Sequence, residues 1–363
     1  MKKNHDITIL LTIYNRLEYT IKWLDFAEKQ KIPFDIFISD GGNIHDIKKK
    51  LNLKKKNLNI TYRKFKFFKN YKNIYQKYFF VIKYIKTKFV IVAEDDDFIN
   101  IDGFIKSSNF LLNNKDYGSV KGINLLGEFI LNGSNPISFV LRNENSSNNE
   151  QDLRNENSEF RLIDFFKRKN FSIFNGLHRT KNLRKVFDFL GKRDFYNLYI
   201  TELIFVLILV YLGKIKRFDY IDYIKMNNTE LSSSNNFSKF RPFSKITSSV
   251  KYTYENNLIF KFIKFKNKKN EFFFKNLYYE FLDNDARIRI SEEKIYRSYS
   301  RKLRNIFREL LIKIKVFYIL KKMYLIFFKS KMVNKNIALL NKNIINTSKK
   351  NMKFLEFILK NYN

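Results

Sequence analysis

Segments with two different hydrophobic periods alternate over the first hundred residues of the chain. Residues 7–13 form a compact β-branched run that predicts a strand, and residues 16–30 place apolar side chains on one stripe of a helix. The pattern continues with expected strands at 34–38, 59–62 and 88–93 and an expected helix at 71–86. Strands that alternate with helices are joined by right-handed crossovers and form a parallel sheet covered on both faces. We therefore expect a doubly wound α/β fold.

The second half of the chain is less regular. Helices are expected at 103–113, 160–168, 181–190 and 195–212, and strands at 119–130 and 214–225. Gly213 is placed to end the last of these helices, because glycine favours the left-handed C-cap conformation. The sequence Leu-Arg-Asn-Glu-Asn-Ser occurs at 141–146 and again at 153–158. Since this stretch has almost no large apolar residues, we expect 141–159 to be a solvated insertion.

These patterns divide the chain into three parts. Residues 1–226 form the expected α/β domain, and the Ser- and Asn-rich segment 227–249 is an expected linker or mobile loop. Residues 250–363 are basic, rich in aromatic side chains and predicted to be mainly helical. Within them, 303–329 has the pattern of a basic amphipathic helix, which suits either an anionic membrane surface or packing on the α/β domain.

No segment has the character of a signal peptide or a membrane span. Residues 1–6 are polar and run directly into the first strand, and the longest apolar run, 203–212, has ten residues, about half of the ~20 that cross a bilayer. We expect a cytoplasmic protein, peripheral on the cytoplasmic face of the inner membrane where it contacts a membrane. The chain has no Cys, which excludes a disulfide scaffold, a Cys-ligated zinc site and a cysteine nucleophile.

The chain is strongly basic, with 70 Lys and Arg against 35 Asp and Glu and a net charge of +35. Such a charge attracts phosphates, so nucleic acid or an anionic membrane is a natural partner. Lys and the aromatic residues Phe and Tyr are abundant together while Gly and Pro are scarce, and an AT-rich coding bias produces the same pattern. The charge alone therefore selects no function.

Polar side chains follow three of the predicted strands. The segments are 12–16 after the first strand, 39–43 after the second, and the acidic run 94–97 after the fourth. In an open α/β sheet, ligands bind beside the carboxyl ends of the strands. Four consecutive carboxylates repel one another unless a cation neutralises them, and oxygen ligands suit Mg²⁺ or Mn²⁺. We expect Asp95 and Asp97, on one side of an extended segment, to share a metal ion, although an acidic run can also cap the following helix.

These residues resemble those of a known family. Thr12-Ile-Tyr-Asn-Arg16, Asp40-Gly-Gly-Asn43 and Ala93-Glu-Asp-Asp-Asp-Phe98 look like the opening of inverting GT-A glycosyltransferases of the family 2 type. Segments 174–180, 201–203 and 213–217 look like the later half of a bacterial surface-polysaccharide subgroup, so the resemblance covers about residues 5–230. It implies a GT-A, Rossmann-like nucleotide-diphospho-sugar transferase sheet, followed by a mainly helical, basic C-terminal region.

The resemblance also implies roles for individual residues of the first half. Asp40 would bind the base or ribose of a nucleotide-sugar donor, with Thr12 and Tyr14 in the same pocket. Asp95 and Asp97 would hold a divalent metal ion on the donor diphosphate, whose negative charge that ion would neutralise. Asp-Gly-Gly-Asn stands where Asp-Gly-Ser is common in the family.

Three residues of the later half complete the predicted site. The resemblance implies that Glu202 is the acidic residue that in the family precedes or forms the catalytic base, although Leu203 follows it and not a second acid. Its place at the start of a very apolar helix is expected to bury it and raise its pKa. His178 is a candidate third metal ligand or phosphate contact, and Arg179 a candidate clamp on the diphosphate. The alternatives are a helix-terminal charge for Glu202 and a purely structural histidine for His178.

We predict a metal-dependent, inverting glycosyltransferase that moves a sugar from a nucleotide-diphosphate sugar to a surface-polysaccharide or lipid-linked acceptor. Its cofactor would be Mn²⁺ or Mg²⁺, and an anionic membrane surface is a further expected partner. A sugar-nucleotide nucleotidyltransferase is one alternative, but the loop after the first strand, 14–17, has no glycine to cradle a triphosphate. A non-catalytic nucleic-acid-binding protein is the other. No known binding module is recognised, so no nucleic-acid partner is expected.

Overall fold

A computed structural model describes most of the first 300 residues. The described residues are 6–42, 48, 51, 57–65, 74–132, 135–143, 152–167, 173–193, 195, 198–226, 250–296, 354–355 and 357–358. The predicted linker 227–249 and the predicted amphipathic helix 303–329 lie outside them.

Within the described residues, the strands and helices expected from the sequence are present in the expected order. The strands are β1 (Ile7–Ile13), β2 (Asp35–Asp40), β3 (Asn59–Lys64), β4 (Phe89–Glu94), β5 (Phe98–Ile99), β6 (Tyr117–Asn132), β7 (Asn135–Asn143), β8 (Leu177–Arg179) and β9 (Lys214–Met226). The helices are α1 (Leu17–Lys29), α3 (Ile74–Ile82), α4 (Ile101–Asn113), α5 (Ser158–Lys167), α6 (Thr180–Gly191), α7 (Leu198–Leu212), α10 (Val250–Phe262) and α11 (Lys268–Tyr296). Three of the strands, β5, β7 and β8, were not expected from the sequence.

The described strands form one sheet of nine strands, in the order β3-β2-β1-β4-β8-β6-β9-β5, with β7 paired to β6. The half made by β3, β2, β1 and β4 is parallel, which confirms the α/β fold class. The other half is mixed, because β8 runs antiparallel to both β4 and β6. The two-residue connection from β6 to β7 also forces an antiparallel pair, since a parallel pair needs a long crossover.

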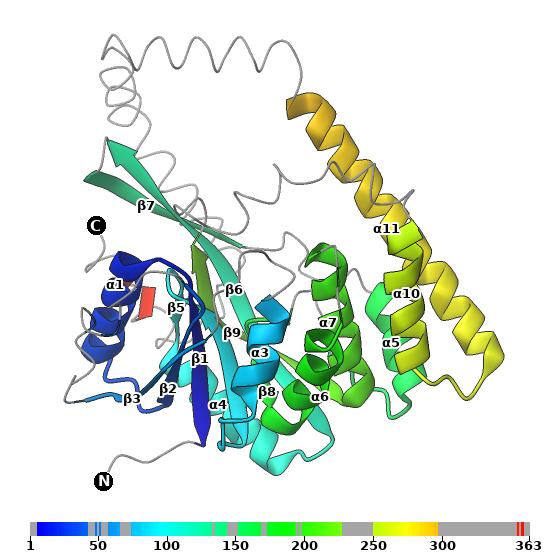
Figure 1. Ribbon diagram of the computed structural model, residues 1–363, viewed down its shortest axis with the longest axis horizontal. Coiled ribbons are helices and arrows are strands. Elements are labelled where there is room, and N and C mark those ends of the chain that lie inside the picture. The colour runs from blue at the N-terminus through cyan, green and yellow to red at the C-terminus, as the bar shows by residue number, and fades with distance from the viewer. Residues whose placement is uncertain are drawn as a thin grey trace.

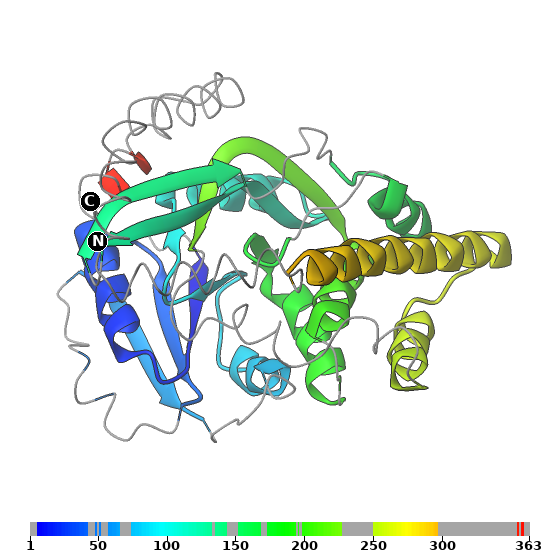
Figure 2. The same cartoon turned by 90° about the horizontal axis from the view of Figure 1, so that it is seen from above.

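Helices cover both faces of this sheet (Figures 1 and 2), and an apolar core lies between the helices and the sheet on each face. Successive side chains of a strand point to opposite faces. In β1, Ile9 and Leu11 pack with α1 and α4, whereas Leu10 packs with α3, α6 and α7. The expected doubly covered sheet is therefore present, and its strands read as nearly continuous apolar runs because both faces are buried.

Helix α7 is apolar on all sides, and its residues from Ile204 to Val210 are at most 5% exposed. Its last residue is Leu212, and the backbone N–H of Gly213 donates to the Leu209 carbonyl at 3.2 Å. The expected left-handed C-cap is wrong, because the φ of Gly213 lies outside the left-handed region. Glycine is needed there for a close approach instead, since a Cβ atom would lie 2.8 Å from the Gly118 nitrogen. Across the described ranges, no helix combines the length and the hydropathy that crossing a bilayer requires.

The repeated segment is more structured than a solvated insertion. Its first copy begins inside β7, which includes residues 141–143. In its second copy, Leu153 is 1% exposed and exchanges two backbone hydrogen bonds of 3.0 Å with Ile215. The leucine that begins the second copy is therefore buried, although the four residues that follow it are exposed.

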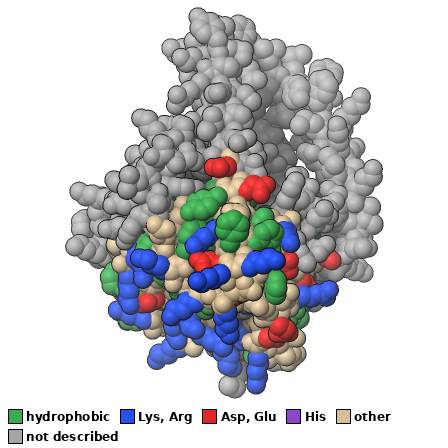
Figure 3. Space-filling view, turned by 90° about the vertical axis from the view of Figure 1, so that its right-hand side faces the viewer, with side chains coloured by type: hydrophobic (Ala, Val, Ile, Leu, Met, Phe, Trp, Pro, Cys, Tyr) green, Lys and Arg blue, Asp and Glu red, His purple; other side chains and the backbone are tan. Residues whose placement is uncertain are grey.

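Helices α10 and α11 share the core of the helical layer. Phe166 of α5 lies 5.6 Å from Phe274 and 6.0 Å from Tyr278 of α11, measured between ring centroids. The Glu159 carboxylate accepts hydrogen bonds from the Lys266 backbone N–H at 2.5 Å and from the Asn270 amide at 2.7 Å. Helix α11 is thus packed on α5. Figure 3 shows this side of the molecule, where Lys and Arg surround hydrophobic side chains. By contrast, Phe354, Leu355 and Ile358 of the same C-terminal region are buried in the core on the other face of the sheet.

Candidate functional site

Three parallel strands end side by side at one edge of the sheet. In the register of the sheet, Thr12 of β1 pairs with Ser39 of β2 and with Glu94 of β4, and Ile13 pairs with Asp40. Neighbouring strands lie about 4.8 Å apart. The polar segments that the sequence places after these strands are therefore neighbours in space, as predicted.

The acidic run after β4 forms a turn. Strand β4 ends at Glu94, and the Asp97 backbone N–H donates back to the Glu94 carbonyl at 3.3 Å. One carboxylate oxygen from each of Glu94, Asp96 and Asp97 lies within 4.8 Å of the other two. We call these three residues the acidic cluster. The expectation of an extended segment is wrong here, because a turn does not alternate side chains as a strand does, and Asp95 lies outside the cluster.

Asp95 instead joins the acidic turn to helix α1. Its Oδ1 lies 3.2 Å from Nη1 of Arg16, and its Oδ2 accepts a hydrogen bond of 2.9 Å from the Thr20 hydroxyl. The same guanidinium reaches Asp96, with Nη2 at 2.8 Å from Oδ2. Burial raises the pKa of Asp95 to about 7, although Arg16 acts in the opposite direction. Arg16 thus stabilises the acidic turn through ion pairs with two carboxylates of that turn, those of Asp95 and Asp96.

Asp97 is held by the end of β9. The Tyr223 hydroxyl donates to its Oδ2 at 2.6 Å, and the Met226 backbone N–H donates to its Oδ1 at 2.8 Å. Burial, together with the charges of Asp96 and Glu94, raises the pKa of Asp97 well above its ordinary value. Burial likewise raises the pKa of Glu94. A divalent cation would relieve this repulsion, and three carboxylate oxygens at these separations fit Mg²⁺ or Mn²⁺.

Asp40, at the end of β2, is completely buried. Its Oδ1 accepts the Gly42 backbone N–H at 2.8 Å, and its Oδ2 accepts the Tyr62 hydroxyl at 2.5 Å and the Lys64 ammonium at 2.8 Å. Burial and the hydrogen bond to Asp40 raise the pKa of Tyr62. Both carboxylate oxygens are therefore fixed in place by β2, β3 and the turn that follows β2.

The other two residues predicted for the nucleotide pocket lie on or beside β1. The Thr12 hydroxyl is 3.4 Å from the Tyr78 hydroxyl of α3, and Tyr14 is 40% exposed. Between them and Asp40, the turn after β2 comes very close to Asn15. A Cβ atom on Gly42 would lie 2.3 Å from the Asn15 side-chain oxygen, so only glycine fits this close approach.

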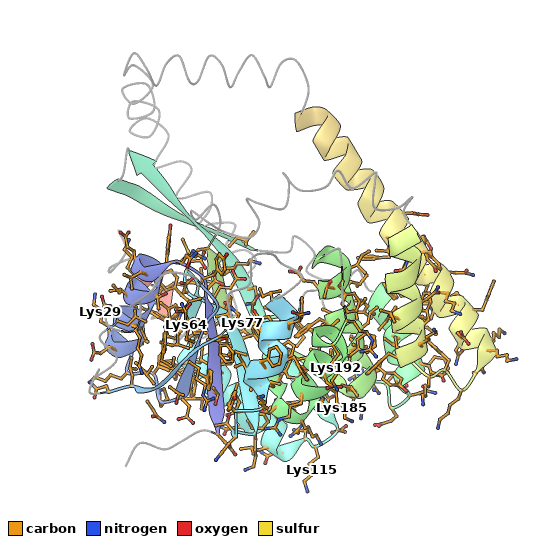
Figure 4. The ribbon with its side chains drawn as sticks, viewed as in Figure 1. Lys29, Lys64, Lys77, Lys115, Lys185 and Lys192 are labelled. Atoms are coloured by element: carbon orange, nitrogen blue, oxygen red, sulfur yellow. The ribbon has the colours of Figure 1, made fainter. Side chains whose placement is uncertain are left out.

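A buried lysine near the acidic cluster was missed by the sequence analysis. Lys77 of α3 is 5% exposed and lies close enough to Asp40, Asp95 and Glu94 for their charges to act on it. Burial nevertheless lowers its pKa to about 8. Figure 4 shows Lys77 and Lys64 at the same end of the sheet. The helical spacing of the sequence could have predicted that Lys77 is buried, because Lys77 lies on the apolar face of α3 with Val81, four residues later.

Glu202, the predicted catalytic base, lies in the first half of α7 and is exposed. The expectation that it is buried is wrong, since the most apolar part of the helix begins only at the next residue. Its charge nevertheless acts on two buried tyrosines of α3. Burial raises the pKa of Tyr75 and Tyr78, and the carboxylates of Glu202 and Glu94 raise both further. Glu202 therefore shares an electrostatic environment with the acidic cluster.

His178 and Arg179 lie away from the acidic cluster. In the register of the sheet they pair with Val90 and Phe89, at the start of β4, whereas the cluster follows its end. His178 is fully buried, its Nδ1 is 2.8 Å from the Ser119 hydroxyl and its Nε2 is 3.2 Å from the Phe174 carbonyl. Burial lowers its pKa to about 4. The predicted metal-ligand role of His178 is therefore wrong, because both ring nitrogens lie within hydrogen-bonding distance of groups inside the protein, away from the acidic cluster.

Arg179 is used in the same structural way. Its Nε donates to the Tyr117 carbonyl at 2.7 Å, and its Nη2 donates to the carbonyls of Leu111 and Asn114 at 2.6 and 2.9 Å. These carbonyls belong to the end of α4 and the turn after it, so the guanidinium caps that turn. The diphosphate clamp predicted for Arg179 is corrected on this ground.

The fold and the site define an α/β protein in which carboxylates and a buried lysine meet at the carboxyl ends of parallel strands. No sequence profile of a known protein family matches the chain, and no curated protein matches it in sequence. Among solved structures, it is similar to a fragment of TarS from S. aureus, with 14% identity, a TM-score of 0.42 and 70% of each chain covered. The same fragment in complex with UDP-GlcNAc gives 15% identity and a TM-score of 0.41, over 70% of this chain and 71% of that one.

Proposed function

We propose that this chain is a metal-dependent glycosyltransferase whose donor is a nucleoside-diphosphate sugar. The observation that carries the proposal is the acidic cluster, which lies at the end of β4 beside the buried Asp40 and the buried Lys77. The carboxylates of the acidic cluster would bind a divalent cation, and the lysine would contact the negatively charged diphosphate of the donor. Neutralising the diphosphate makes it a better leaving group, and this is the chemistry that Mg²⁺ or Mn²⁺ supplies when bound.

The side chains around the cluster support individual roles. Asp40 would act at the base or ribose of the nucleoside through the groups that its buried carboxylate positions, such as the Tyr62 hydroxyl and the Lys64 ammonium. The exposed ring of Tyr14 offers a face for the base to stack on. Lys77 is a buried cation on the side of the site where the diphosphate would lie. Burial of Lys77 costs desolvation free energy that the charges of the nearby carboxylates only partly offset, so a functional reason for keeping the lysine there is expected.

Glu202 is the proposed base of the transfer step. It is exposed, so a bulky glycan or lipid-linked acceptor can reach it, and its charge acts on Tyr75 and Tyr78 together with that of Glu94. In the proposed reaction, the acceptor hydroxyl gives its proton to Glu202 and its oxygen attacks the anomeric carbon, while the bond from that carbon to the diphosphate breaks. Attack from the face opposite the leaving group would invert the anomeric centre.

A thermal-shift screen tests the proposal. UDP-, GDP-, CDP- and dTDP-sugars are each added with Mn²⁺ and with EDTA, and one donor class should raise the melting temperature only when Mn²⁺ is present. Glu94→Gln should abolish that shift. It is a cleaner variant than Asp97→Asn, because no hydrogen bond among the described residues involves the Glu94 side chain. Glu280→Gln, the same change at an exposed position of α11, is the matched control. No shift with any donor would contradict the proposal.

A further inference from the structure

A polar pocket lies at the edge of the sheet opposite the acidic cluster. It has a volume of about 160 Å³. One side is lined by residues 115–118, which lead from α4 into β6, and the other by Arg179 and the first turns of α6. Arg179 pairs with the first residue of β4, and Tyr117 pairs with the first residue of β9. The pocket is therefore at the amino ends of strands whose carboxyl ends form the candidate site. Figure 4 shows Lys115 and Lys185 on this lower side of the molecule.

The walls of this pocket, which we call the basic pocket, are positively charged. Its lining includes Lys115, Arg179, Lys181 and Lys185. The three lysines make no ion pair with any residue in the described ranges. The carboxylate in the lining, Asp116, is paired with Lys214 at 2.5 Å. Four cations and one carboxylate give the lining a formal charge of +3, without counting Lys214.

The start of helix α6 adds backbone donors to the same wall. The helix has 12 residues, and its cap residue, Arg179, makes no side-chain capping hydrogen bond. The first N–H groups of a helix have no acceptor within it and carry the positive end of the helix dipole. Lys181 and Asn182, in that first turn, both line the basic pocket. The Thr180 N–H already donates to the Lys88 carbonyl at 2.9 Å, so the backbone donors that this helix start offers to the pocket are those of Lys181 and Asn182.

Asn182 gives an independent sign that something binds there. Its side chain is 5% exposed and lines the pocket, yet it makes no hydrogen bond within the described part of the chain. The amide atoms are not among the fully buried, unpartnered atoms of the described residues, so they are reachable from the pocket. The amide nitrogen lies next to Gly118, because a Cβ atom on that glycine would lie 2.7 Å from it. Buried amide groups nearly always have a partner, and a ligand in the pocket would supply one.

We propose that the basic pocket binds a phosphate-type anion. The three observations are the unpaired lysines, the uncapped helix start and the buried Asn182 amide, and together they are the donors that phosphate sites use. The volume of about 160 Å³ holds about five waters at ~30 Å³ each. This is smaller than the ~300 Å³ or more of pockets for drug-sized ligands. The pocket therefore accepts one phosphate group, either as the free ion or as the end of a larger molecule. This proposal does not depend on the proposed function.

Calorimetric titration with inorganic phosphate, at low ionic strength and in EDTA, tests the proposal. EDTA keeps metal ions from recruiting phosphate to the acidic cluster. The wild-type chain should bind one phosphate saturably. The double variant Lys181→Glu and Lys185→Glu changes the lining charge from +3 to −1 and should weaken binding by roughly tenfold or more. The double variant Lys268→Glu and Lys269→Glu makes the same charge change in the first turn of α11 and should bind as the wild type does.

A second variant tests the pocket through a single change of side chain in its wall. Asn182→Asp keeps the size of the side chain and places a carboxylate in the first turn of α6, where it favours the helix. It should retain the melting temperature and lose phosphate binding. Absence of saturable binding by the wild type, or equal binding by Asn182→Asp, would overturn the proposal.

Two further titrations distinguish the sources of the phosphate group. Glycerol phosphate competing with inorganic phosphate would support a site for the end of a larger phosphate ester. Failure to compete, with inorganic phosphate still bound, would support a site for the free ion. Binding only to vesicles that contain phosphatidylglycerol, with neither small anion bound, would contradict a phosphate pocket.

Discussion

The carboxyl groups of the candidate site are poised between protonated and charged forms because they are buried together. Asp95 has its pKa raised to about 7, mainly by burial, and Asp97 has its pKa raised well above the ordinary value. A buried carboxylate without a counter-ion costs free energy, and the protein limits that cost by holding a proton. A divalent cation competes for the same oxygens, so metal binding and proton release are linked.

This linkage predicts a pH dependence for metal binding. The pKa values of Glu94 and Asp97 are raised, so protons occupy these groups at a pH where ordinary carboxyls are charged. Metal affinity should therefore keep rising with pH above about pH 4–5, the range in which ordinary carboxyl groups lose their protons. A Mn²⁺ titration followed by electron paramagnetic resonance measures it. An affinity that does not rise with pH above this range would show that the acidic cluster does not bind the ion.

Lys77 is predicted to serve binding at the expense of stability. Its pKa is about 8, below the ordinary value of a lysine, so the charged form is disfavoured in the folded state. A lowered folded pKa means that stability falls as the pH drops through about 8. Lys77→Met should therefore raise the free energy of unfolding at pH 7 by roughly 1–3 kcal/mol, as urea denaturation measures. It should also weaken donor binding.

The matched control for this variant is Lys86→Met, which removes an exposed lysine just after α3. It should change neither quantity. If Lys77→Met destabilises the protein, or leaves donor binding intact, Lys77 has a structural role and not the one proposed.

At the scale of the secondary-structure elements, the parallel half of the sheet could be predicted closely. The apolar β-branched run 7–13 is β1 over the same residues, and the polar segments after β1, β2 and β4 do meet at one edge. Hydrophobic period and chain order decide these features, so a single sequence contains them. The two-residue strand β5 was not predicted, because an apolar pair has no period that distinguishes it from a turn.

The orientation of single side chains could not be predicted in the same way. The sequence predicts an extended acidic run. In the structure, the Asp97 backbone N–H donates to the Glu94 carbonyl, so the run forms a turn in which Asp95 lies beside Arg16. His178 and Arg179 stand out in the sequence, yet they bond to residues such as Ser119 and Leu111 that lie about 60 positions earlier in the chain. Such contacts depend on tertiary packing, and local pattern gives no sign of them.

Helices α3 and α6 must pack closely for Lys77 to be buried. A Cβ atom on Gly191 would lie 2.4 Å from Cβ of Phe79 and 2.8 Å from the Tyr75 carbonyl oxygen. Gly191→Ala should therefore push the helices apart and cost roughly 1–3 kcal/mol of stability, measured by urea denaturation. Lys192→Ala, at the adjacent exposed position, should change it by a few tenths only. Equal effects of the two variants would contradict this account of the packing.

At the scale of the whole molecule, the net charge of +35 is spread over surfaces with different uses. The acidic cluster is an exception to it on one edge of the sheet, and the basic pocket is a concentration of it on the other. The described C-terminal helices add lysines on the side shown in Figure 3. The net charge alone indicates no function, whereas the positions of the acidic cluster and the basic pocket indicate where a cation and an anion would bind.

The packing of α11 on α5 predicts that the C-terminal region and the sheet domain unfold together. Phe274 is fully buried against Phe166, whereas Phe272 is 68% exposed. Phe274→Ala should cost about 3–5 kcal/mol, and Phe272→Ala within about 0.5 kcal/mol. Melting followed by circular dichroism should show one lowered transition for Phe274→Ala. An unchanged transition for the sheet would instead support residues 1–226 as an independent domain.

If the acidic cluster supports glycosyl transfer, as we propose, the chain should release nucleoside diphosphate from a sugar donor. This release can be measured for the four donor classes with Mn²⁺ and with EDTA. We expect release from one class that depends on Mn²⁺ and falls by about 100-fold or more in Glu94→Gln, with Glu280→Gln as active as the wild type. Release that continues in EDTA, or that Glu94→Gln retains in full, would contradict the proposal.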